Sequence, residues 1–520
     1  MKKDNHFVKA GAILVLSGVL VKVLSAAYRI PLTRMLGPYS MGRYSTIFNI
    51  FMPFYSFATA GIAPCISKFT TQYYTNKDTK KLKSLKVKAM LVYMTLSVLL
   101  IIIFLAFGAV YSRKINDEII FTGAVILSPN ILFATAENVY KGYTQGKMNM
   151  IPTAISNVLE SVSKTTMGLC GVFFIKYVMN NTQQDLPVIV CLLAVSISGL
   201  ICVSYLFFSV KEKDTAKFTL SKEVSSKQLL KMSVPIAVSA LLVSLVSFFD
   251  TAVCLPIIKS LPQDIVMQSY KGGSFKGAGE ISIYLFGIYQ GMVLTIFNLV
   301  PAMLSSIGVA CLPYITKATV TENKAQLQKS ANKLFMITSG ISVPMCTYAF
   351  VYRKEILSFL FSTTENQTEI SSSLLAIIIP FGVIASFIFA FNNILYALEK
   401  SDCVFKILLF ASVIKCSISA FLSSIPQINI RAFAVSTCAF YTIIFVLSMF
   451  KIKKFGIKFS FFKIFFVPFS ASFVVITAVN YIIKTVFVFL PIFWLVIFSG
   501  LFFCLGYFLV TILAGFFVDI

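Results

Sequence analysis

Histidine and acidic residues are scarce in this sequence, and their scarcity excludes most kinds of catalytic site. The 520 residues include a single histidine, His6, near the start of the chain, and 20 Asp and Glu against 45 Lys and Arg. The 11 cysteines are scattered through apolar runs and form no C-x-x-C pair, so their spacing indicates neither a metal site nor a disulfide framework. We therefore expect no catalytic residues, no metal and no cofactor, and predict that the protein is not an enzyme.

Charged residues make up only 12% of the chain, while hydrophobic residues make up 58%. Repeated apolar runs of about 20 residues predict membrane-spanning helices. The net charge of +25 does not indicate nucleic-acid binding, because the lysines lie mostly in loops between the apolar runs and form no basic domain. A basic cytoplasmic face accounts for the charge. The first run follows a basic start but lacks a small-residue cleavage site, so we expect an uncleaved first span.

The apolar runs predict an all-α polytopic membrane protein with fourteen transmembrane helices. Lysine and arginine are concentrated in the segments that share a side with the N-terminus, which predicts cytoplasmic N- and C-termini in the cell membrane. The predicted spans are residues 8–34, 43–67, 87–111, 118–140, 151–178, 187–210, 229–258, 281–316, 334–351, 371–397, 403–424, 431–450, 464–483 and 486–517.

An internal repeat divides this series of spans. Residues 47–70, IFNIFMPFYSFATAGIAPCISKFT, align with residues 296–319, IFNLVPAMLSSIGVACLPYITKAT, so the second and eighth spans are equivalent. We predict two pseudo-symmetric six-helix lobes in the same orientation, followed by two extra helices. Parallel repeats in a membrane protein place a substrate path between the lobes and favour alternating access. The predicted boundaries are 1–215, 216–451 and 452–520.

Four cations lie within or beside predicted spans, at Lys22, Arg29, Lys164 and Lys415. A charge near the bilayer centre costs about 2.5–3.5 kcal/mol on the insertion scale, so these side chains are not expected to face lipid. Lys22 and Arg29 are seven residues apart, nearly on one helix face. We predict that the four cations line a water-filled cavity that binds an anion such as a pyrophosphate.

Alternatives remain for several of these residues. Lys22 is either a cavity residue or snorkels to the interface, and Lys164 forms either a structural pair with Glu160 or part of a ligand site, since the two lie four residues apart. Asp250 is either an interface residue or, like Glu160, a counter-ion or a ligand of a coupling cation. We interpret Glu137 as structural.

Three segments carry a resemblance to bacterial polysaccharide exporters. Residues 137–164, ENVYKGYTQGKMNMIPTAISNVLESVSK, resemble a signature in which a Gly-Tyr-x-Gln-Gly turn precedes Pro-Thr-Ala and a Glu. Residues 59–69, TAGIAPCISKF, resemble a second-span motif, and residues 21–45 resemble a first span with a cation and a Tyr-Arg pair. The chain resembles the multidrug/oligosaccharidyl-lipid/polysaccharide (MOP) exporter superfamily, specifically its stage V sporulation protein B branch, with the MurJ-type lipid II flippases as relatives.

The resemblance implies a MATE-like fold and a lipid-linked cargo. In lipid II flippases the last two helices form a groove for the lipid tail, and residues 464–517 are apolar and aromatic enough to do the same. Those flippases also carry arginines in spans two and eight, whereas residues 51–61 contain no charge. Their contacts with cargo are therefore not carried over to this chain.

These observations predict a flippase that moves an undecaprenyl-pyrophosphate-linked glycan, with lipid II for spore cortex as the first candidate. Another lipid-linked polysaccharide repeat unit is the alternative, and a cation-coupled multidrug antiporter is a weaker one, because such a protein requires carboxylates in its cavity. A glycan polymerase is disfavoured by short outside loops with few carboxylates. Expected partners are the glycan lipid, membrane lipids and a coupling Na+ or H+, and we expect a monomer.

Overall fold

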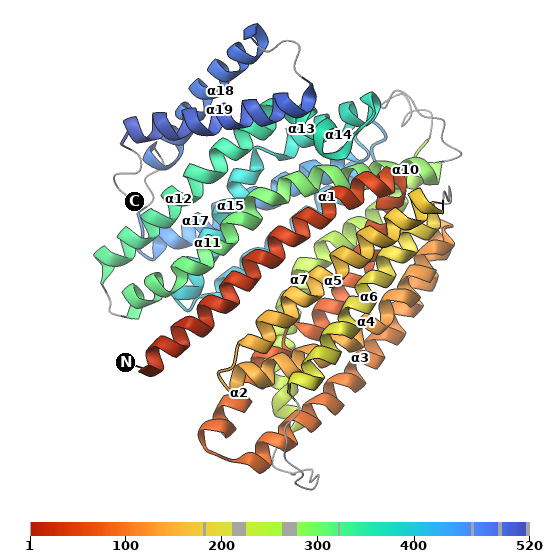
Figure 1. The fold of residues 1–520 in the computed structure, drawn as a ribbon, viewed down its shortest axis with the longest axis vertical. Coiled ribbons are helices and arrows are strands. Elements are labelled where there is room, and N and C mark those ends of the chain that lie inside the picture. The colour runs from red at the N-terminus through yellow and green to blue at the C-terminus, as the bar shows by residue number, and fades with distance from the viewer. Residues whose placement is uncertain are drawn as a thin grey trace. The chain divides into compact units, whose positions relative to one another are not determined.

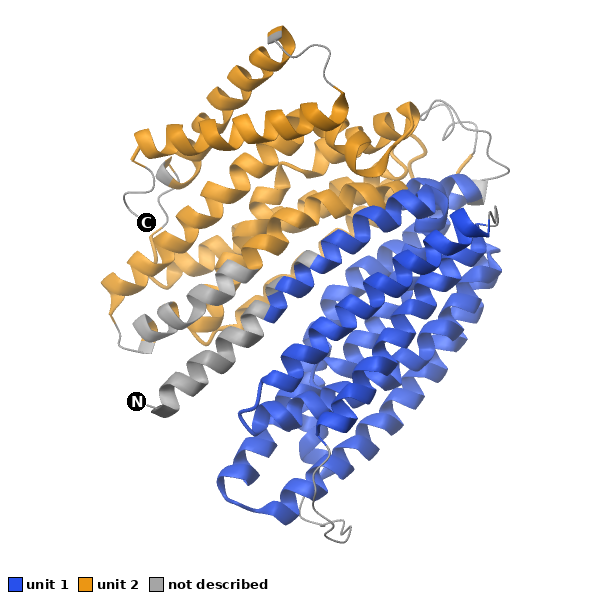
Figure 2. Cartoon of the chain, viewed as in Figure 1, with its two compact units in different colours: residues 1–260, 277–287 blue, residues 261–276, 288–520 orange. Residues whose placement is uncertain are grey.

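The computed structural model describes residues 2–179, 184–210, 225–262, 278–320, 323–458, 462–486 and 491–515. Within these ranges the regular structure is entirely helical, mostly α with short π-helical segments (Figure 1). The chain divides into two compact units, coloured separately in Figure 2: unit 1 is Met1–Ser260 with Gly277–Gly287, and unit 2 is Leu261–Lys276 with Ile288–Ile520. The lobe boundaries inferred from the repeat remain a prediction.

Unit 1 is a bundle in which α1 and α4 contact most of the other helices. α1 packs against α5, α7 and α10, while α4 packs against α2, α3 and α6. Its elements are α1 (Lys2–Thr59), α2 (Ile62–Thr75), α3 (Thr79–Ile115), α4 (Glu118–Gly146), α5 (Ile151–Phe173), η1 (Phe174–Val178), α6 (Asp185–Ser209), α7 (Ser226–Phe249), η2 (Asp250–Cys254), α8 (Leu255–Lys259) and α10 (Ala278–Gly287).

The long helix α1 is broken at Gly37. This residue has φ 74° and ψ 170°, a backbone conformation outside the helical region that glycine adopts at low cost. Pro38 follows and lacks a backbone N–H, so the hydrogen-bond ladder does not cross the break. Gly42 and Pro38 lie directly against α10, and α2, the continuation of α1, lies at the opposite end of unit 1 (Figure 1).

Glycines allow α2 and α4 to approach closely. A Cβ atom at Gly142 would fall 2.7 Å from the carbonyl oxygen of Ala63, and one at Gly146 would fall 2.7 Å from that of Ser67. Small residues four positions apart are typical of close helix packing in membranes. The resemblance to polysaccharide exporters implies a turn at Gly-Tyr-Thr-Gln-Gly, but here the segment forms the last turns of α4, and its glycines form a packing surface.

Unit 2 has its main apolar core where α12, α15 and α17 meet. Phe335, Phe387 and Phe391 are almost completely buried there. Its elements are η3 (Ile288–Val293), α11 (Leu294–Val320), α12 (Lys324–Val351), α13 (Arg353–Phe361), α14 (Glu365–Ile378), α15 (Phe381–Ala397), α16 (Ser401–Ser423), α17 (Arg431–Lys454), η4 (Phe462–Phe466), α18 (Val467–Val486) and α19 (Ile492–Leu513).

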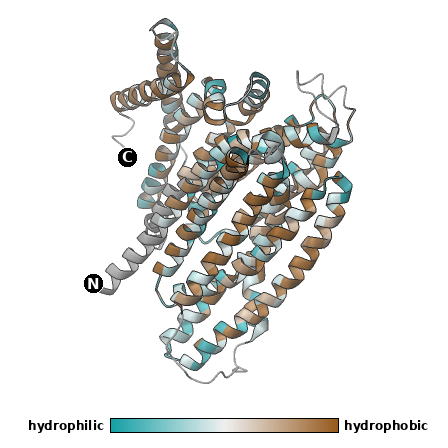
Figure 3. Cartoon of the chain, turned by 45° about the vertical axis from the view of Figure 1, so that its right-hand side comes forward, coloured by the Kyte–Doolittle hydropathy of each residue, from teal (hydrophilic) through white to brown (hydrophobic). Residues whose placement is uncertain are grey.

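The described helices establish a multi-pass membrane protein. Twelve of them are long and apolar enough to cross a membrane, or thirteen if the pair α14 and α15, bent by 45°, is one span. Apolar residues run along the helices in Figure 3, and polar residues gather toward helix ends and connections. The predicted all-α class is confirmed. The predicted count of fourteen is not reached, partly because the predicted spans 8–34 and 43–67 are not separated: most of both lies in Leu20–Thr75, which counts as one candidate span.

Candidate functional site

A line of polar residues runs along one side of α5, inside unit 1. Asn157, Glu160, Lys164 and Gly168 follow one another at intervals of three or four residues, which places them on one helix face. Two of them contact side chains of α1 and α4. The face belongs to the candidate span Ile151–Val178, which matches a span predicted from the sequence.

At one end of this line, an ion pair on α4 meets α5. The ammonium Nζ of Lys141 lies 2.6 Å from Glu137 Oε1 and also 2.6 Å from Asn157 Oδ1, to which it donates a hydrogen bond. The contact with Glu137 is an ion pair rather than an aligned hydrogen bond. Only 2% of Glu137 is exposed. A carboxylate so deeply buried requires compensation, and Lys141 supplies part of it.

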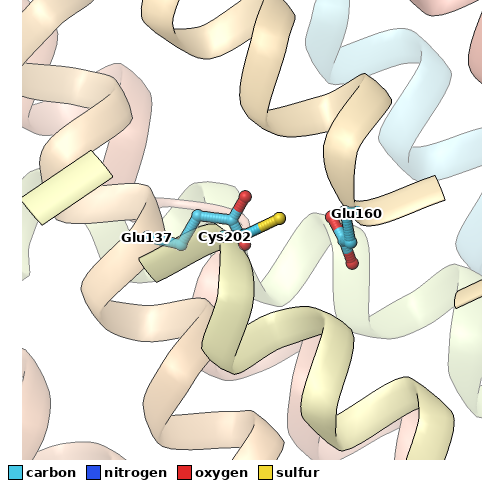
Figure 4. A group of neighbouring side chains, drawn as sticks. All are labelled: Glu137, Glu160 and Cys202. Carbon is cyan, nitrogen blue, oxygen red and sulfur yellow. The ribbon is translucent and has the colours of Figure 1, made fainter. Parts of the chain in front are cut away.

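Glu137, Glu160 and Cys202 form the next group, drawn from α4, α5 and α6 (Figure 4). One ligand atom from each lies within 4.8 Å of the others. The thiol of Cys202 also donates a hydrogen bond of 3.2 Å to the carbonyl oxygen of Ser156. Two carboxylates at this separation repel each other unless a proton or a cation lies between them. The group can therefore exchange a proton or hold a small cation.

Beyond Glu160, the line becomes cationic. Lys164 is attracted by the carboxylate of Glu160 and repelled by the guanidinium of Arg29 in α1. Its Nζ lies 5.8 Å from the centroid of the Tyr28 ring, within the range of a cation–π interaction. The Tyr28 ring itself packs against Gly168. The structure thus brings together three of the six residues predicted from the sequence: Arg29, Glu160 and Lys164.

The other three predicted residues lie elsewhere. Lys22 is exposed on α1, seven residues or about two helical turns before Arg29. Lys415 is buried in α16 of unit 2, where 3% of it is exposed. Asp250 is 4% exposed at the start of η2, beside Thr251, whose carbonyl oxygen accepts a 2.5 Å hydrogen bond from the Tyr111 hydroxyl. The predicted roles of all three stay predictions.

The sequence did not point to Lys141, Asn157 or Cys202. The spacing of Glu137 and Lys141 is a readable i, i+4 pair, which fits the structural interpretation of Glu137. The approach of Glu137 to Glu160 depends on how α4, α5 and α6 pack, and no spacing within one helix contains that information.

A second feature lies in unit 2. An apolar cavity of about 730 Å³ is bounded by α12, α15, η4 and α18. Four phenylalanines dominate one wall: Phe465, Phe466, Phe469 and Phe473. These residues belong to the segment 464–517 that the sequence singled out for a lipid tail.

The chain is similar to proteins of a known family. A family model described as "Polysaccharide biosynthesis protein" matches residues 7–319, more than half of the chain. The chain belongs to this family. A second model, MatE, matches residues 290–421. Both place the chain in the MOP superfamily of transporters, as its resemblance to polysaccharide exporters implied, and the prediction that it is not an enzyme is confirmed.

Individual relatives share little sequence identity with this chain but align with most of its length. The stage V sporulation protein B of Bacillus subtilis (strain 168) is 23% identical over 83% of this chain and 80% of its own length. The lipid II flippase MurJ of the same organism is 19% identical over 82% of this chain and 78% of its own length. A solved structure, "Lipid II flippase MurJ, inward closed conformation", covers 98% of both chains with a TM-score of 0.67 and 16% identity. That likeness establishes the fold.

Proposed function

We propose that this transporter is a flippase for lipid-linked oligosaccharides that carry an undecaprenyl-pyrophosphate anchor. Lipid II is the first candidate cargo, with spore cortex synthesis as its use, and another lipid-linked polysaccharide repeat unit is the alternative. The observation that carries the proposal is the contact of Lys164 with Tyr28, the residue beside Arg29, between two membrane-spanning helices of unit 1.

The charge balance of this site favours an anionic cargo. Arg29, Lys164 and Glu160 together carry one net positive charge, and Lys22 adds another on the same helix as Arg29. Each charge at the bilayer centre costs about 2.5–3.5 kcal/mol, and a transporter retains such a charge when its cargo offsets this cost. A pyrophosphate supplies that offset, since phosphate groups pair with arginine through two parallel hydrogen bonds and with lysine as a point charge. A cationic drug carries the wrong sign of charge to supply this offset.

The apolar cavity of unit 2 supports a lipid-linked cargo. Its volume of about 730 Å³ and its phenylalanine wall suit several isoprene units of the carrier tail. We propose that the carrier tail lies along α18.

Glu137 and Glu160 are the proposed coupling site. Their carboxylates lie close enough for one proton, or one cation such as Na+, to bridge them. Because Lys164 also interacts with Glu160, loss of the bridging proton strengthens the hold of Glu160 on Lys164 and weakens the hold of Lys164 on an anion. Proton binding thereby favours cargo binding, and proton loss favours cargo release. Asp250 remains a second candidate for this role.

We also propose the topology of the predicted fold. The stretch Leu20–Thr75 has 56 residues, about 84 Å as a helix, whereas a bilayer core is about 30 Å thick. Division at Gly37 would make two spans of it, which together with the bent pair α14–α15 would give fourteen. An even number puts both termini on one side of the membrane, and the concentration of Lys and Arg on that side supports the cytoplasmic side.

Complementation tests the function directly. Bacteria depleted of their lipid II flippase would receive either this protein or its Lys164→Gln form, and inner-leaflet lipid II would be followed by its accessibility to a membrane-impermeant reagent. We expect the unaltered protein to restore growth and outer-leaflet lipid II, and Lys164→Gln to fail at equal membrane abundance. Lys114→Gln, at the exposed end of α3, is the matched control. Absence of rescue by the unaltered protein would exclude lipid II and leave the other lipid-linked glycans.

A further inference from the structure

Unit 1 contains a cavity lined by basic and aromatic residues, at the connection between α2 and α3. It has a volume of about 420 Å³. Tyr73 and Tyr74 line it from α2, Lys77 from the connection, Lys83 from α3, and Lys147 from the residue that follows α4. Two connections that are far apart in sequence therefore share one cavity.

Hydrogen bonds fix the walls of this cavity. The hydroxyl of Thr71 donates to the carbonyl oxygen of Gly146 at 3.0 Å, which joins α2 to the end of α4. Asp78 caps α3, with its Oδ1 accepting a 3.0 Å hydrogen bond from the backbone N–H of Lys81. Lys77 adopts a left-handed conformation, φ 55°, at the tight turn before the cap. The lysines are held around the cavity by a defined backbone rather than by a loose loop.

The lining has a surplus of positive charge. Lys77, Lys83 and Lys147 face one carboxylate, Asp78, so the lining carries two net positive charges. Asp78 is already engaged, because the backbone N–H of Lys81 holds its pKa below the usual value and the Lys81 ammonium lies 3.4 Å away. Lys86 lies outside the lining, with its Nζ 5.4 Å from the centroid of the Tyr143 ring.

Lys147 also packs on Tyr143. Its Nζ lies 4.4 Å from the ring centroid. Cation–π contacts of this kind orient an ammonium without neutralising it. Several like charges around one cavity repel each other, and a bound anion relieves that repulsion.

We propose that this cavity binds a phosphate-bearing anion. Two sources share that chemistry: the headgroup of an anionic phospholipid in the adjacent leaflet, and a soluble phosphate or pyrophosphate. Basic pockets at the ends of membrane helices bind anionic headgroups. Tyr74, 52% exposed beside the cavity, is of a type that lies at the level of the headgroups. A bound phosphate would bridge Lys83 and Lys147, and so tie the α2–α3 connection to the α4–α5 connection.

Binding to the full-length purified protein tests this proposal without any transport assay. Phosphatidylglycerol and phosphatidylcholine would be titrated separately in detergent and followed by native mass spectrometry, and inorganic pyrophosphate would be titrated by calorimetry. The test variant is Lys77→Gln/Lys83→Gln/Lys147→Gln. The matched control, Lys451→Gln/Lys453→Gln/Lys454→Gln, removes the same charge from exposed positions at the end of α17.

We expect one anion to bind the unaltered protein and the control at least about tenfold more tightly than the test variant, because each lysine near the surface contributes substantially to such binding. Preference for phosphatidylglycerol identifies the lipid source, and binding of pyrophosphate alone identifies the soluble source. Equal losses in test variant and control, or no binding of either anion, would overturn the proposal.

Asp78→Asn gives an opposite prediction that does not depend on weakening the fold. Asparagine caps a helix as well as aspartate does, while the cavity gains one unit of positive charge. Binding of the same anion should become up to about fivefold tighter. Tighter binding by Asp78→Asn together with weaker binding by the triple variant supports a site in this cavity, and unchanged binding by both overturns it.

Discussion

The ring of Tyr28 in α1 lies against Gly168 of α5, so closely that a Cβ atom at residue 168 would fall 2.9 Å from its Cε2 and hydroxyl atoms. The same ring faces the ammonium of Lys164. Position 168 therefore sets where Tyr28 lies, and Tyr28 in turn restricts where the Lys164 ammonium lies.

Gly168→Ala should consequently impair transport and stability together. The added methyl group overpacks the contact, and we expect a loss of about 1–3 kcal/mol in the free energy of unfolding. Thermal unfolding in detergent and the flippase assay measure the two effects. Gly18→Ala is the control, since a Cβ there meets nothing within 4 Å and alanine favours a helix. If Gly168→Ala behaves like Gly18→Ala, the ring contact has no role.

Lys22→Ala should reduce transport at least about tenfold without lowering membrane abundance, because the side chain is exposed and its loss leaves no packing defect. Transport rate per unit of membrane protein is the measurement. Unchanged transport would remove Lys22 from the site.

Lys415→Met tests the cation of unit 2. The substitution retains the apolar stem and removes the charge, and transport should fall at least about tenfold if the charge contacts cargo. Lys406→Met, at an exposed position of the same helix, is the matched control and should transport normally. Similar behaviour of both variants would exclude a role for Lys415 in transport.

Glu137→Gln and Glu160→Gln should uncouple transport from its driving gradient. Each substitution removes one of the two carboxylates that we propose to share a bridging proton or cation. In proteoliposomes with an imposed pH or Na+ gradient, we expect the gradient to accelerate the unaltered protein and to have little effect on either variant. Glu118→Gln, exposed at the start of α4, should keep the full response. A normal response by both site variants would contradict the coupling proposal.

Arg43 joins three helical segments of unit 1, so we expect Asp117→Asn to lower the free energy of unfolding. The guanidinium of Arg43 donates two hydrogen bonds to Asp117, at 2.8 and 3.1 Å, and a further one to Asp185. Asp117 is buried, so loss of its charge should cost about 3 kcal/mol. Asp185 is more than half exposed, and Asp185→Asn should cost less than about 1 kcal/mol. Thermal unfolding of the two variants distinguishes them, and equal losses would contradict this assignment.

The helices of this protein were largely predictable from sequence, because an apolar run of about 20 residues has few alternatives to a membrane span. Span 151–178 agrees with Ile151–Val178, and the Glu160–Lys164 pair follows from helical spacing. The breaks were less predictable. Gly37 interrupts the helix through a single residue, so the helical hydrogen bonds resume at once and α1 extends over two predicted spans.

The site was predictable only one helix at a time. Glu137 and Glu160 are 23 positions apart and belong to different helices, and their proximity depends on how α4 and α5 pack. Interpreting Glu137 as a local structural residue was reasonable for α4 alone. The carboxylate of Glu160 on α5 changes the chemistry that Glu137 can perform.

The π-helical turn η2 is one place where we expect the chain to tolerate a change of length. A π turn contains one residue more than an α turn of the same helix, and in η2 this surplus lies between α7 and α8. Removal of Val253, whose side chain is 38% exposed, would convert the turn to α and leave the flanking helices facing their present neighbours. Elsewhere in a regular helix, the loss of one residue rotates everything that follows by about 100°.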